Sequence, residues 1–486
     1  MKTLYKLKRD FIISVLAFGL FSCTKGFEEI NQDPTKPTEV TPVQLITGIE
    51  RTASDIIYSG GVNDNIGMLY AQYFSQTQTE TQSQYQLDEA ANNLLWTSYS
   101  TPLSNIQELL RINELKPEPA SGNQNAIAKI LSAWIYQILT DTYGNIPFSE
   151  ALRGDELILT SKYDDSKTIY DGLIALLNEQ INALDPNLSS FRSGELIYNG
   201  DVNKWIKLAN ALKIRIGLRM VNADAAKAKQ VIEEASANTF TGIADEAKFT
   251  YLPLAPDQFP YNDQDGASIS NAYFVSSTLV DFMEETGDPR LPMYARVAPA
   301  SGTIVGKPYG LGSFTNINEY SRGSAKVYST TFPGYILSYA EVQFALAEAA
   351  ARGFNVGGDA ADFYENGIRA SMSFWGVTNN ADIAAFITAN PYDQANWKNI
   401  IGTQKWVALY NQGLQGWFER TRLNFTKPNG DTFFRAPNTI LDNTVTFVPY
   451  RITYPLAEMS NNAENYTQAK TAMGGDNKGI KLWWQE

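Results

Sequence analysis

Histidine is absent from all 486 residues of the chain. This absence removes the usual general base of Ser-His-Asp and Cys-His hydrolases and the commonest metal ligand in proteins. Most hydrolytic and zinc-dependent activities are therefore excluded, and we expect no catalytic residue, no metal site and no cofactor. Glycoside hydrolysis by a pair of carboxylates needs no histidine, so a glycosidase stays open as an alternative.

Cysteine occurs once, at Cys23, so the chain can form no intramolecular disulfide. Basic residues and the apolar run 11–21 precede Ser22-Cys23, an arrangement typical of a bacterial signal peptide that ends at a lipidation site. The apolar run is too short for a membrane-spanning helix, which needs about 20 residues. We therefore predict a signal peptide over 1–22 and membrane attachment through a lipid on Cys23. An ordinary secretory peptide with an incidental cysteine is the alternative.

Positive charge is also scarce. Without residues 1–22 the chain keeps 35 basic and 51 acidic side chains, a net charge of −16. A surface of that sign repels nucleic acid and anionic lipid, so we expect no nucleic-acid partner. Lys213, Arg215 and Arg219 alternate with apolar residues at helical spacing and indicate a helix face, not a phosphate-binding patch.

Apolar residues recur every three to four positions in many segments, which is typical of amphipathic helices. The clearest example is 126–140, where Ile127, Ile130 and Trp134 share one face. Similar patterns cover 103–113, 167–184, 203–221, 224–237, 338–352, 359–374 and 395–416. Because most of these segments form pairs joined by short turns, the sequence predicts a mainly α fold built from repeated helix pairs.

The periodic pattern stops between residues 243 and 335, where Gly, Pro, Ser, Asn and aromatic residues take over. Irregular segments of this length usually carry function. The alternating run 248–252 predicts a few short strands, and 262–266 resembles the start of a calcium loop without its closing Glu, so a plain turn is favoured. With a Pro-containing tether over 23–43, we expect one domain over 44–486 that has a helical half and a loop-rich half.

Six stretches carry a more specific signal. They are Phe27–Pro34 (FEEINQDP), Asp141–Leu152 (DTYGNIPFSEAL), Trp205–Leu212 (WIKLANAL), Asp288–Leu291 (DPRL), Tyr339–Gly353 (YAEVQFALAEAAARG) and the ending Arg451–Trp484, which opens with RITYP and includes Glu458. In this order, and spread over nearly the whole chain, they resemble the SusD/RagB family of nutrient-binding outer-membrane lipoproteins.

The resemblance implies tetratricopeptide-like helix pairs that support an irregular ligand-binding half. It also implies a lipoprotein on the outer face of the outer membrane that binds a nutrient, commonly an oligosaccharide, and delivers it to a SusC-like TonB-dependent transporter. Such a protein is not an enzyme. A glycosidase with a carboxylate pair and a non-binding structural surface protein are the alternatives.

Ligand-binding residues are expected among loop aromatics, because a sugar ring stacks on an aromatic face while amides and carboxylates bind its hydroxyls. Trp96 is the leading candidate, with core packing as the alternative. Tyr73 and Tyr85 flank a run rich in Gln, Thr and Ser, for which a solvated surface loop is the alternative. The irregular half adds Tyr261, Asn262, Tyr273, Tyr309, Phe314 and Tyr320. We predict that these residues form one contiguous ligand surface.

Overall fold

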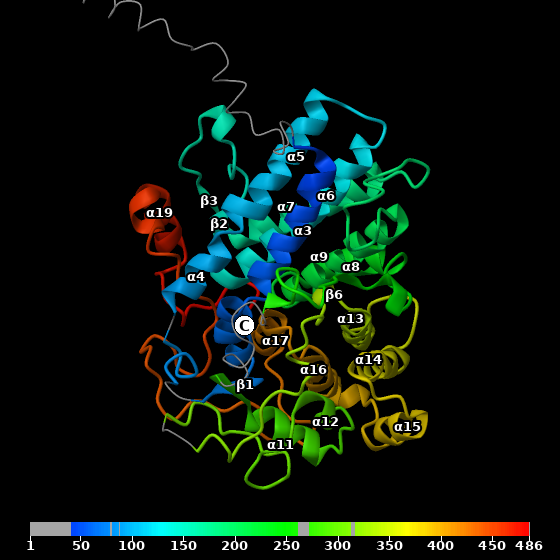
Figure 1. Cartoon of the computed structure of the whole chain (residues 1–486), viewed down its shortest axis with the longest axis vertical. Coiled ribbons are helices and arrows are strands. Elements are labelled where there is room, and N and C mark those ends of the chain that lie inside the picture. The colour runs from blue at the N-terminus through cyan, green and yellow to red at the C-terminus, as the bar shows by residue number, and fades with distance from the viewer. Residues whose placement is uncertain (1–39, 78–79, 87, 261–271, 313–315, 486) are drawn as a thin grey trace, which may run out of the picture. The chain divides into compact units, whose positions relative to one another are not determined.

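The computed structural model describes residues 40–77, 80–86, 88–260, 272–312 and 316–485. Within these ranges Pro42–Glu486 forms one unit, and its secondary structure is mainly helical (Figure 1). The few short strands make three two-stranded sheets. The predicted mainly α fold with few short strands is therefore confirmed. None of the helices in the described ranges combines the length and apolar character needed to cross a membrane.

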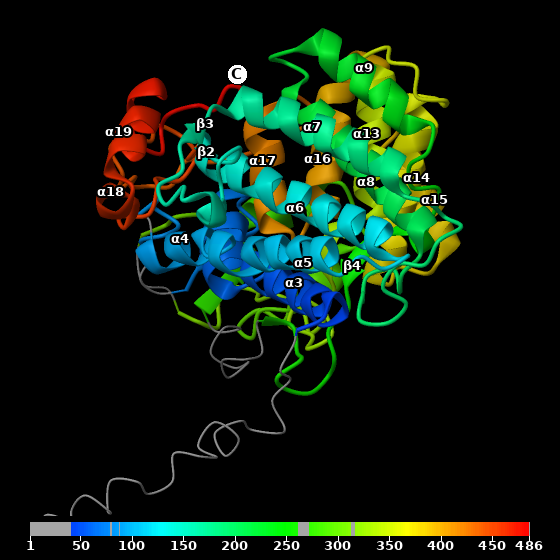
Figure 2. The ribbon, with the colours of Figure 1, turned by 90° about the horizontal axis from the view of Figure 1, so that it is seen from above.

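The helical half is a succession of packed helix pairs. Its helices are α3 (Pro42–Ile57), α5 (Ser104–Leu115), α6 (Ser121–Tyr143), α7 (Ser166–Ala183), α8 (Val202–Met220), α9 (Ala225–Ser236), α13 (Tyr339–Ala351), α14 (Ala360–Trp375), α15 (Asn380–Ala389), α16 (Trp397–Ala408) and α17 (Gly413–Leu423). Helix α6 packs on α7, α8 on α9, and α13 on α14, while α8 also contacts α7 and α13 (Figure 2). The predicted helix-pair scaffold is present.

Capping side chains set where several of these helices begin. Asp165 accepts the N–H of Thr168 at the start of α7, and Asp224 accepts that of Lys227 at the start of α9. An acceptor side chain at this position satisfies an amide that has no partner inside the helix. These caps explain why the predicted boundaries lie within a few residues of the observed ones.

The stretch 395–416 forms two helices, α16 and α17, where the sequence predicts one. Asn411 adopts φ 70°, a left-handed conformation that an α-helix does not contain. Helix α17 then begins at Gly413, whose N–H donates to Asn63 Oδ1 at 2.8 Å. A Cβ atom at Gly413 would lie 2.3 Å from the amide nitrogen of Met68, so this close approach of two backbones requires glycine.

The segment 243–335 is mostly irregular, but it contains two short α-helices that the sequence does not predict. Its elements are η5 (Ile243–Asp245), β4 (Ala247–Phe249), β5 (Tyr273–Val275), α11 (Ser277–Glu285), α12 (Leu291–Tyr294) and β6 (Gly334–Leu337). Strand β5 pairs antiparallel with β1 (Phe74–Gln76), and β4 pairs antiparallel with β6. Helix α11 is capped by Ser276 and buries Leu279, Val280 and Phe282, but its nine residues are too few to show a clear period.

Buried ion pairs connect the helices of the scaffold. The basic residues Lys213, Arg215 and Arg219 lie on one helix, α8, as predicted, and they are buried in the protein interior. Arg219 bonds to Asp141 of α6 at 3.0 Å and to Glu419 of α17 at 2.8 Å. Arg215 bonds to Glu341 of α13 at 2.7 Å. A buried charge is tolerated because a partner of opposite sign compensates for its lost hydration.

Arg422 of α17 lies at the centre of these ion pairs. Its guanidinium bonds to the carboxylates of Glu348 and Glu419, each at 2.6 Å, and all three side chains are almost completely buried. Burial alone would raise the pKa of Glu348, but Arg422 outweighs that effect and lowers it to about 2. Arg422 likewise holds the pKa of the Glu419 carboxyl well below its usual range against the effect of burial, so both carboxylates are ionised at neutral pH.

We predict that Arg422→Met lowers the free energy of unfolding by about 3–5 kcal/mol, because it leaves two buried carboxylates without their main partner. Urea unfolding followed by circular dichroism measures the change. Arg111→Met is the matched control: Arg111 pairs with Glu108 at the surface, so its loss should barely change the unfolding midpoint. Equal effects of the two substitutions would contradict the central role of Arg422.

Candidate functional site

Trp96 is half-buried and lines a pocket of about 490 Å³. It is the last residue of α4 (Glu89–Trp96), a helix whose first turn is capped by Asp88. We call this pocket the Trp96 groove. Its lining residues are Trp96, Tyr99, Ser104, Gln107, Pro147, Ala151, Leu152, Gly154, Ile158, Leu159, Ser161, Glu458, Asn461 and Asn462. They come from three parts of the sequence, around 96–107, 147–161 and 458–462.

A single carboxylate holds the indole of Trp96 in place. The Nε1–H of Trp96 donates to Glu458 Oε1 at 3.2 Å, and the hydroxyl of Tyr163 donates to Glu458 Oε2 at 2.5 Å. Burial and the nearby Glu458 carboxylate both raise the pKa of Tyr163, so its hydroxyl keeps its proton. Glu458 opens α18 (Glu458–Asn461), while Tyr163 belongs to β3 (Tyr163–Asp164), which pairs with β2 (Ile146–Pro147).

Aromatic rings pack against several other sides of the indole. The ring centroid of Trp96 lies 4.9 Å from that of Tyr143, 5.1 Å from that of Tyr99 and 6.1 Å from that of Tyr454. Tyr99 is fixed in turn, because its hydroxyl donates to the carbonyl of Pro147 at 2.7 Å. The indole of Trp96 thus packs against tyrosines and also lines a groove, and its role as a stacking platform stays a prediction.

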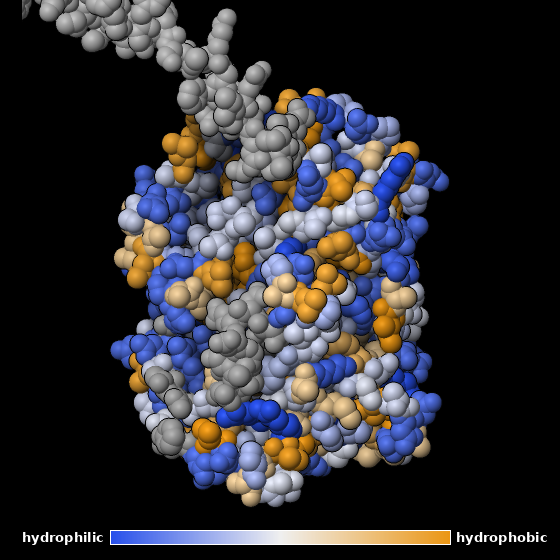
Figure 3. All heavy atoms as spheres, viewed as in Figure 1, coloured by the Kyte–Doolittle hydropathy of each residue, from blue (hydrophilic) through white to orange (hydrophobic). Residues whose placement is uncertain are grey.

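The rest of the groove mixes polar and apolar groups. Hydroxyls and amides line it at Ser104, Gln107 and Asn461, and Asn462 is positioned by a hydrogen bond from its Nδ2 to the carbonyl of Ser161, 2.8 Å long. Leu159 adds an exposed apolar side chain. On the face seen in Figure 3, apolar residues likewise lie in small groups among polar ones. Aromatic faces beside amides and one carboxylate are suited to a ligand with an apolar face and several hydroxyls.

Four of the other predicted site residues are buried, so the predicted stacking role is wrong for them. Tyr73 packs on Trp406, with ring centroids 4.5 Å apart, and donates its hydroxyl to the Trp406 carbonyl. Tyr85 is equally buried and donates its hydroxyl to the Phe447 carbonyl at 3.0 Å. The physical reason is that core neighbours already cover both rings and satisfy both hydroxyls.

The irregular half supplies the other two buried tyrosines. Tyr273 stacks on Phe74 across the β1–β5 pair, with ring centroids 5.5 Å apart. Tyr309 lies beside Tyr85 at 6.3 Å and is 4% exposed. Tyr261, Asn262, Phe314, Cys23 and the calcium-like stretch 262–266 lie outside the described residues.

The polar run between Tyr73 and Tyr85 is not a solvated loop in its described part. Ser75, Glu80 and Ser83 are buried, and Glu80 forms a buried ion pair with Lys307. The side-chain oxygen of Gln76 accepts the N–H of Ser83 at 3.1 Å. These polar side chains satisfy one another and the backbone inside the protein, as buried polar groups must.

Tyr320 is the candidate from the irregular half that is half-exposed, and it lines a second pocket of about 290 Å³. We call it the Tyr320 pocket. Its lining residues are Arg296, Val297, Pro299, Ile317, Asn318, Tyr320 and Arg322. It shares no lining residue with the Trp96 groove, so Trp96 and Tyr320 line two separate pockets. That both aromatics belong to one contiguous ligand surface stays a prediction.

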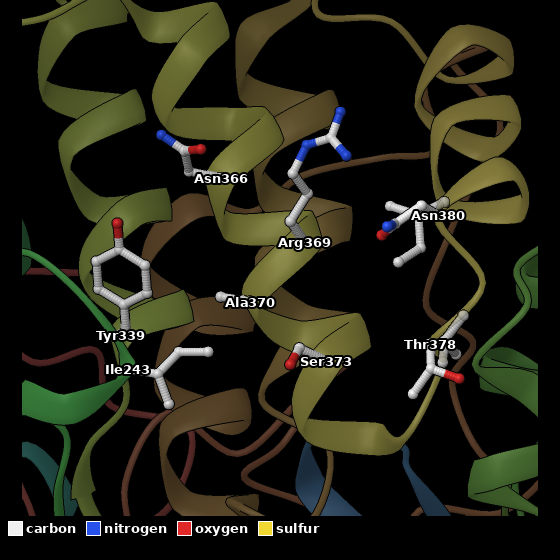
Figure 4. Close-up of a pocket in the computed structure, with 10 residues that line it drawn as sticks. Ile243, Tyr339, Asn366, Arg369, Ala370, Ser373, Thr378 and Asn380 are labelled. Carbon is white, nitrogen blue, oxygen red and sulfur yellow. The ribbon is translucent and has the colours of Figure 1, made fainter.

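A third pocket of about 450 Å³ lies on the helical half, beside α14 (Figure 4). Asn366 and Arg369 extend from α14 at one end, with Tyr339 on one side and Asn380 on the other. Arg369 is already paired with Glu365 of the preceding helical turn at 3.6 Å. This pocket has one aromatic ring, and none of its described lining residues is acidic.

The carboxylate pair Glu50 and Glu195 offers little for catalysis. Glu50 and Glu195 are close enough that burial and Glu195 together raise the pKa of Glu50, which is a feature of glycosidase pairs. However, both are 1% exposed, and Glu195 accepts the N–H groups of Ile197 and Gly200. No sugar can reach this pair, and it serves to hold the chain around 195–200. Across the described ranges, no cluster of three or more potential metal-ligating side chains occurs.

The geometry thus defines a class of protein, a helical-repeat protein with a ligand-sized aromatic groove. A family model described as "Starch-binding associating with outer membrane" matches residues 34–455. The chain therefore belongs to the SusD-like family, as its motifs predict. SusD-like proteins are binding proteins and not enzymes.

Solved structures agree with this assignment. A chitin-binding protein is 28% identical, with a TM-score of 0.79 over 92% of this chain and 100% of that chain. A SusD homologue from Bacteroides uniformis is 25% identical, with a TM-score of 0.80 and the same coverage. A chitin-binding SusD homologue from Flavobacterium johnsoniae, 22% identical with a TM-score of 0.76 over 91% and 97% of the two chains, shows the shared fold. Among curated protein sequences there is no significant match.

Proposed function

We propose that this chain is a cell-surface lipoprotein of the outer membrane that binds an oligosaccharide and delivers it to a SusC-like TonB-dependent transporter. The observation that carries the binding part is the Trp96 groove. The Trp96 indole is oriented by Glu458 and backed by tyrosines, so its position does not have to be ordered when a ligand binds. A preorganised aromatic platform loses little conformational entropy on binding.

The family supports a sugar as the ligand. Its description names starch, and two structurally similar proteins are described as chitin-binding. Starch and chitin share pyranose rings with one apolar face and hydroxyls at the edge. The groove offers matching groups, with Trp96 and Tyr99 for the ring face and Gln107 and Asn462 for the hydroxyls.

A glycosidase is the less supported alternative. It needs two carboxyl groups about 5–10 Å apart on either side of the scissile bond. Of the described residues that line the groove, Glu458 is the one acidic side chain, and it already bonds to Trp96 and Tyr163. A carboxylate held in this way positions the platform and is not free to transfer a proton to a sugar.

We predict that Trp96→Ala weakens binding of chito- or malto-oligosaccharides about tenfold, because it removes the ring on which a sugar stacks. Isothermal titration calorimetry measures the affinity. The matched control is Trp397→Ala: Trp397 is also half-buried, but it lies on α16 against Arg352, outside the groove. Equal losses of affinity in the two variants would contradict the assignment of the groove.

Analysis of the same sugars after long incubation with the protein distinguishes binding from catalysis. We expect them to be recovered intact. Shorter products that disappear in a Glu458→Gln variant would instead favour the glycosidase, and saturable binding of none of the sugars would favour a structural surface protein.

We predict that Cys23→Ser releases the protein from the membrane, because the substitution removes the sulfur that carries the lipid. Fractionation of the native host followed by immunoblotting measures the distribution. Ser22→Ala, next to the cysteine, is the control and should leave the protein in the membrane fraction. A Cys23→Ser protein that stays in that fraction would show that another feature attaches it.

We predict that the tagged protein, extracted from its host in mild detergent, co-purifies with a larger outer-membrane barrel protein. Mass spectrometry of the purified complex identifies the partner. A second tagged lipoprotein of the same membrane controls for incidental recovery of abundant barrels. Repeated isolation of the chain alone would argue against delivery to a transporter.

A further inference from the structure

The Tyr320 pocket contains two arginines that the fold holds opposite one another. Ala295 and Gly323 form an antiparallel bridge, and the N–H of Arg296 donates to the carbonyl of Arg322 at 3.0 Å. The N–H of Ser324 donates to the carbonyl of Tyr294, also at 3.0 Å. This pairing makes Arg296 and Arg322 cross-strand neighbours, and both side chains line the same pocket.

Like charges at such a position are unfavourable on their own. Partial burial and the charge of Arg296 both lower the pKa of Arg322. None of the ion pairs between described residues involves Arg296, and none of the described residues that line the pocket is acidic. The chain as a whole carries a net charge of −13, so this local pair of positive charges is opposite in sign to the overall charge of the protein.

The neighbouring side chains complete a small binding surface. The Arg322 guanidinium lies 5.4 Å from the ring centroid of Phe274, which holds it on one side. Phe274 in turn contacts Tyr320, with ring centroids 5.7 Å apart. Pro299 and Asn318 add an apolar surface and an amide to the pocket. Two guanidinium groups beside an aromatic ring suit a ring-shaped ligand that carries an anionic group.

We propose that the Tyr320 pocket binds the carboxylate or sulfate group of an acidic sugar, with Arg296 and Arg322 as its ligands. Guanidinium groups form paired, charge-assisted hydrogen bonds to planar and tetrahedral oxyanions. An anion between the two arginines also removes their mutual repulsion. A volume of about 290 Å³ suits a single sugar unit, so this pocket selects one acidic sugar unit of a longer oligosaccharide. The proposal rests on the proposed function, since it assumes that the ligand is a sugar.

The test compares three probes by isothermal titration calorimetry: a trigalacturonate, a sulfated disaccharide and a neutral galactose trisaccharide. We expect at least one acidic probe to bind tenfold more tightly than the neutral one. Arg296→Gln and Arg322→Gln should each reduce the affinity for that acidic probe roughly tenfold and leave neutral binding unchanged. Arg111→Gln, which changes an exposed arginine on α5, should leave both affinities unchanged.

The outcomes separate this inference from the proposed function. An acidic preference that persists in the Arg296→Gln/Arg322→Gln double variant, at unchanged melting temperature, would overturn the assignment of the arginines. Neutral binding that depends on Trp96, with no preference for either acidic probe, would overturn the acidic pocket and leave the proposed function intact. Binding of none of these sugars, nor of chito- or malto-oligosaccharides, would overturn both.

Discussion

The packing of this protein depends on the mutual neutralisation of charges in its core. Arg219 of α8 bonds to Asp141 of α6 and to Glu419 of α17. Arg422, one turn further along α17, bonds to Glu348 of α13. An unpaired charge in the interior costs several kcal/mol, so none of these four helices can shift relative to the others without breaking a costly contact. The ion pairs thus fix the register of the helix pairs, which apolar contacts alone would specify less tightly.

The groove is built directly on this fixed scaffold. Two residues after Asp141, α6 ends at Tyr143, whose ring lies against Trp96 and whose carbonyl accepts a hydrogen bond from Arg451 at 2.8 Å. The chain then forms the groove wall over 147–152. The hydroxyl of Tyr454 donates to the carbonyl of Asn145 at 2.5 Å and ties the C-terminal segment to the same place. The groove therefore has the rigidity of the core, which is the property that a preorganised binding site needs.

The scaffold could be predicted from the sequence because its signals are local. Helices such as α6 and α8 show a clear apolar period, and polar caps mark where several of them begin. The break between α16 and α17 could not be predicted from the sequence. It depends on the close approach of Gly413 to Met68, and these residues are far apart in the chain. The same holds for the site. Trp96 was identifiable as a loop-side tryptophan, but Glu458, which orients it, lies 362 residues away. The only local hint was that Glu458 belongs to a family motif.

The tyrosines show why composition alone does not distinguish a candidate binding surface from the core. Aromatic residues among Gln, Ser and Glu describe a sugar-binding loop, and they describe equally well a buried segment whose polar side chains satisfy its own backbone. Tyr73 and Tyr320 both sit in such surroundings, yet Tyr73 is covered by Trp406 while Tyr320 keeps part of its ring at a pocket. The difference is made by the elements that pack on each ring, and those come from distant parts of the chain. An aromatic side chain can contact a ligand only if no other element packs on its ring. This is a property of the tertiary structure and not of the neighbouring residues in the sequence.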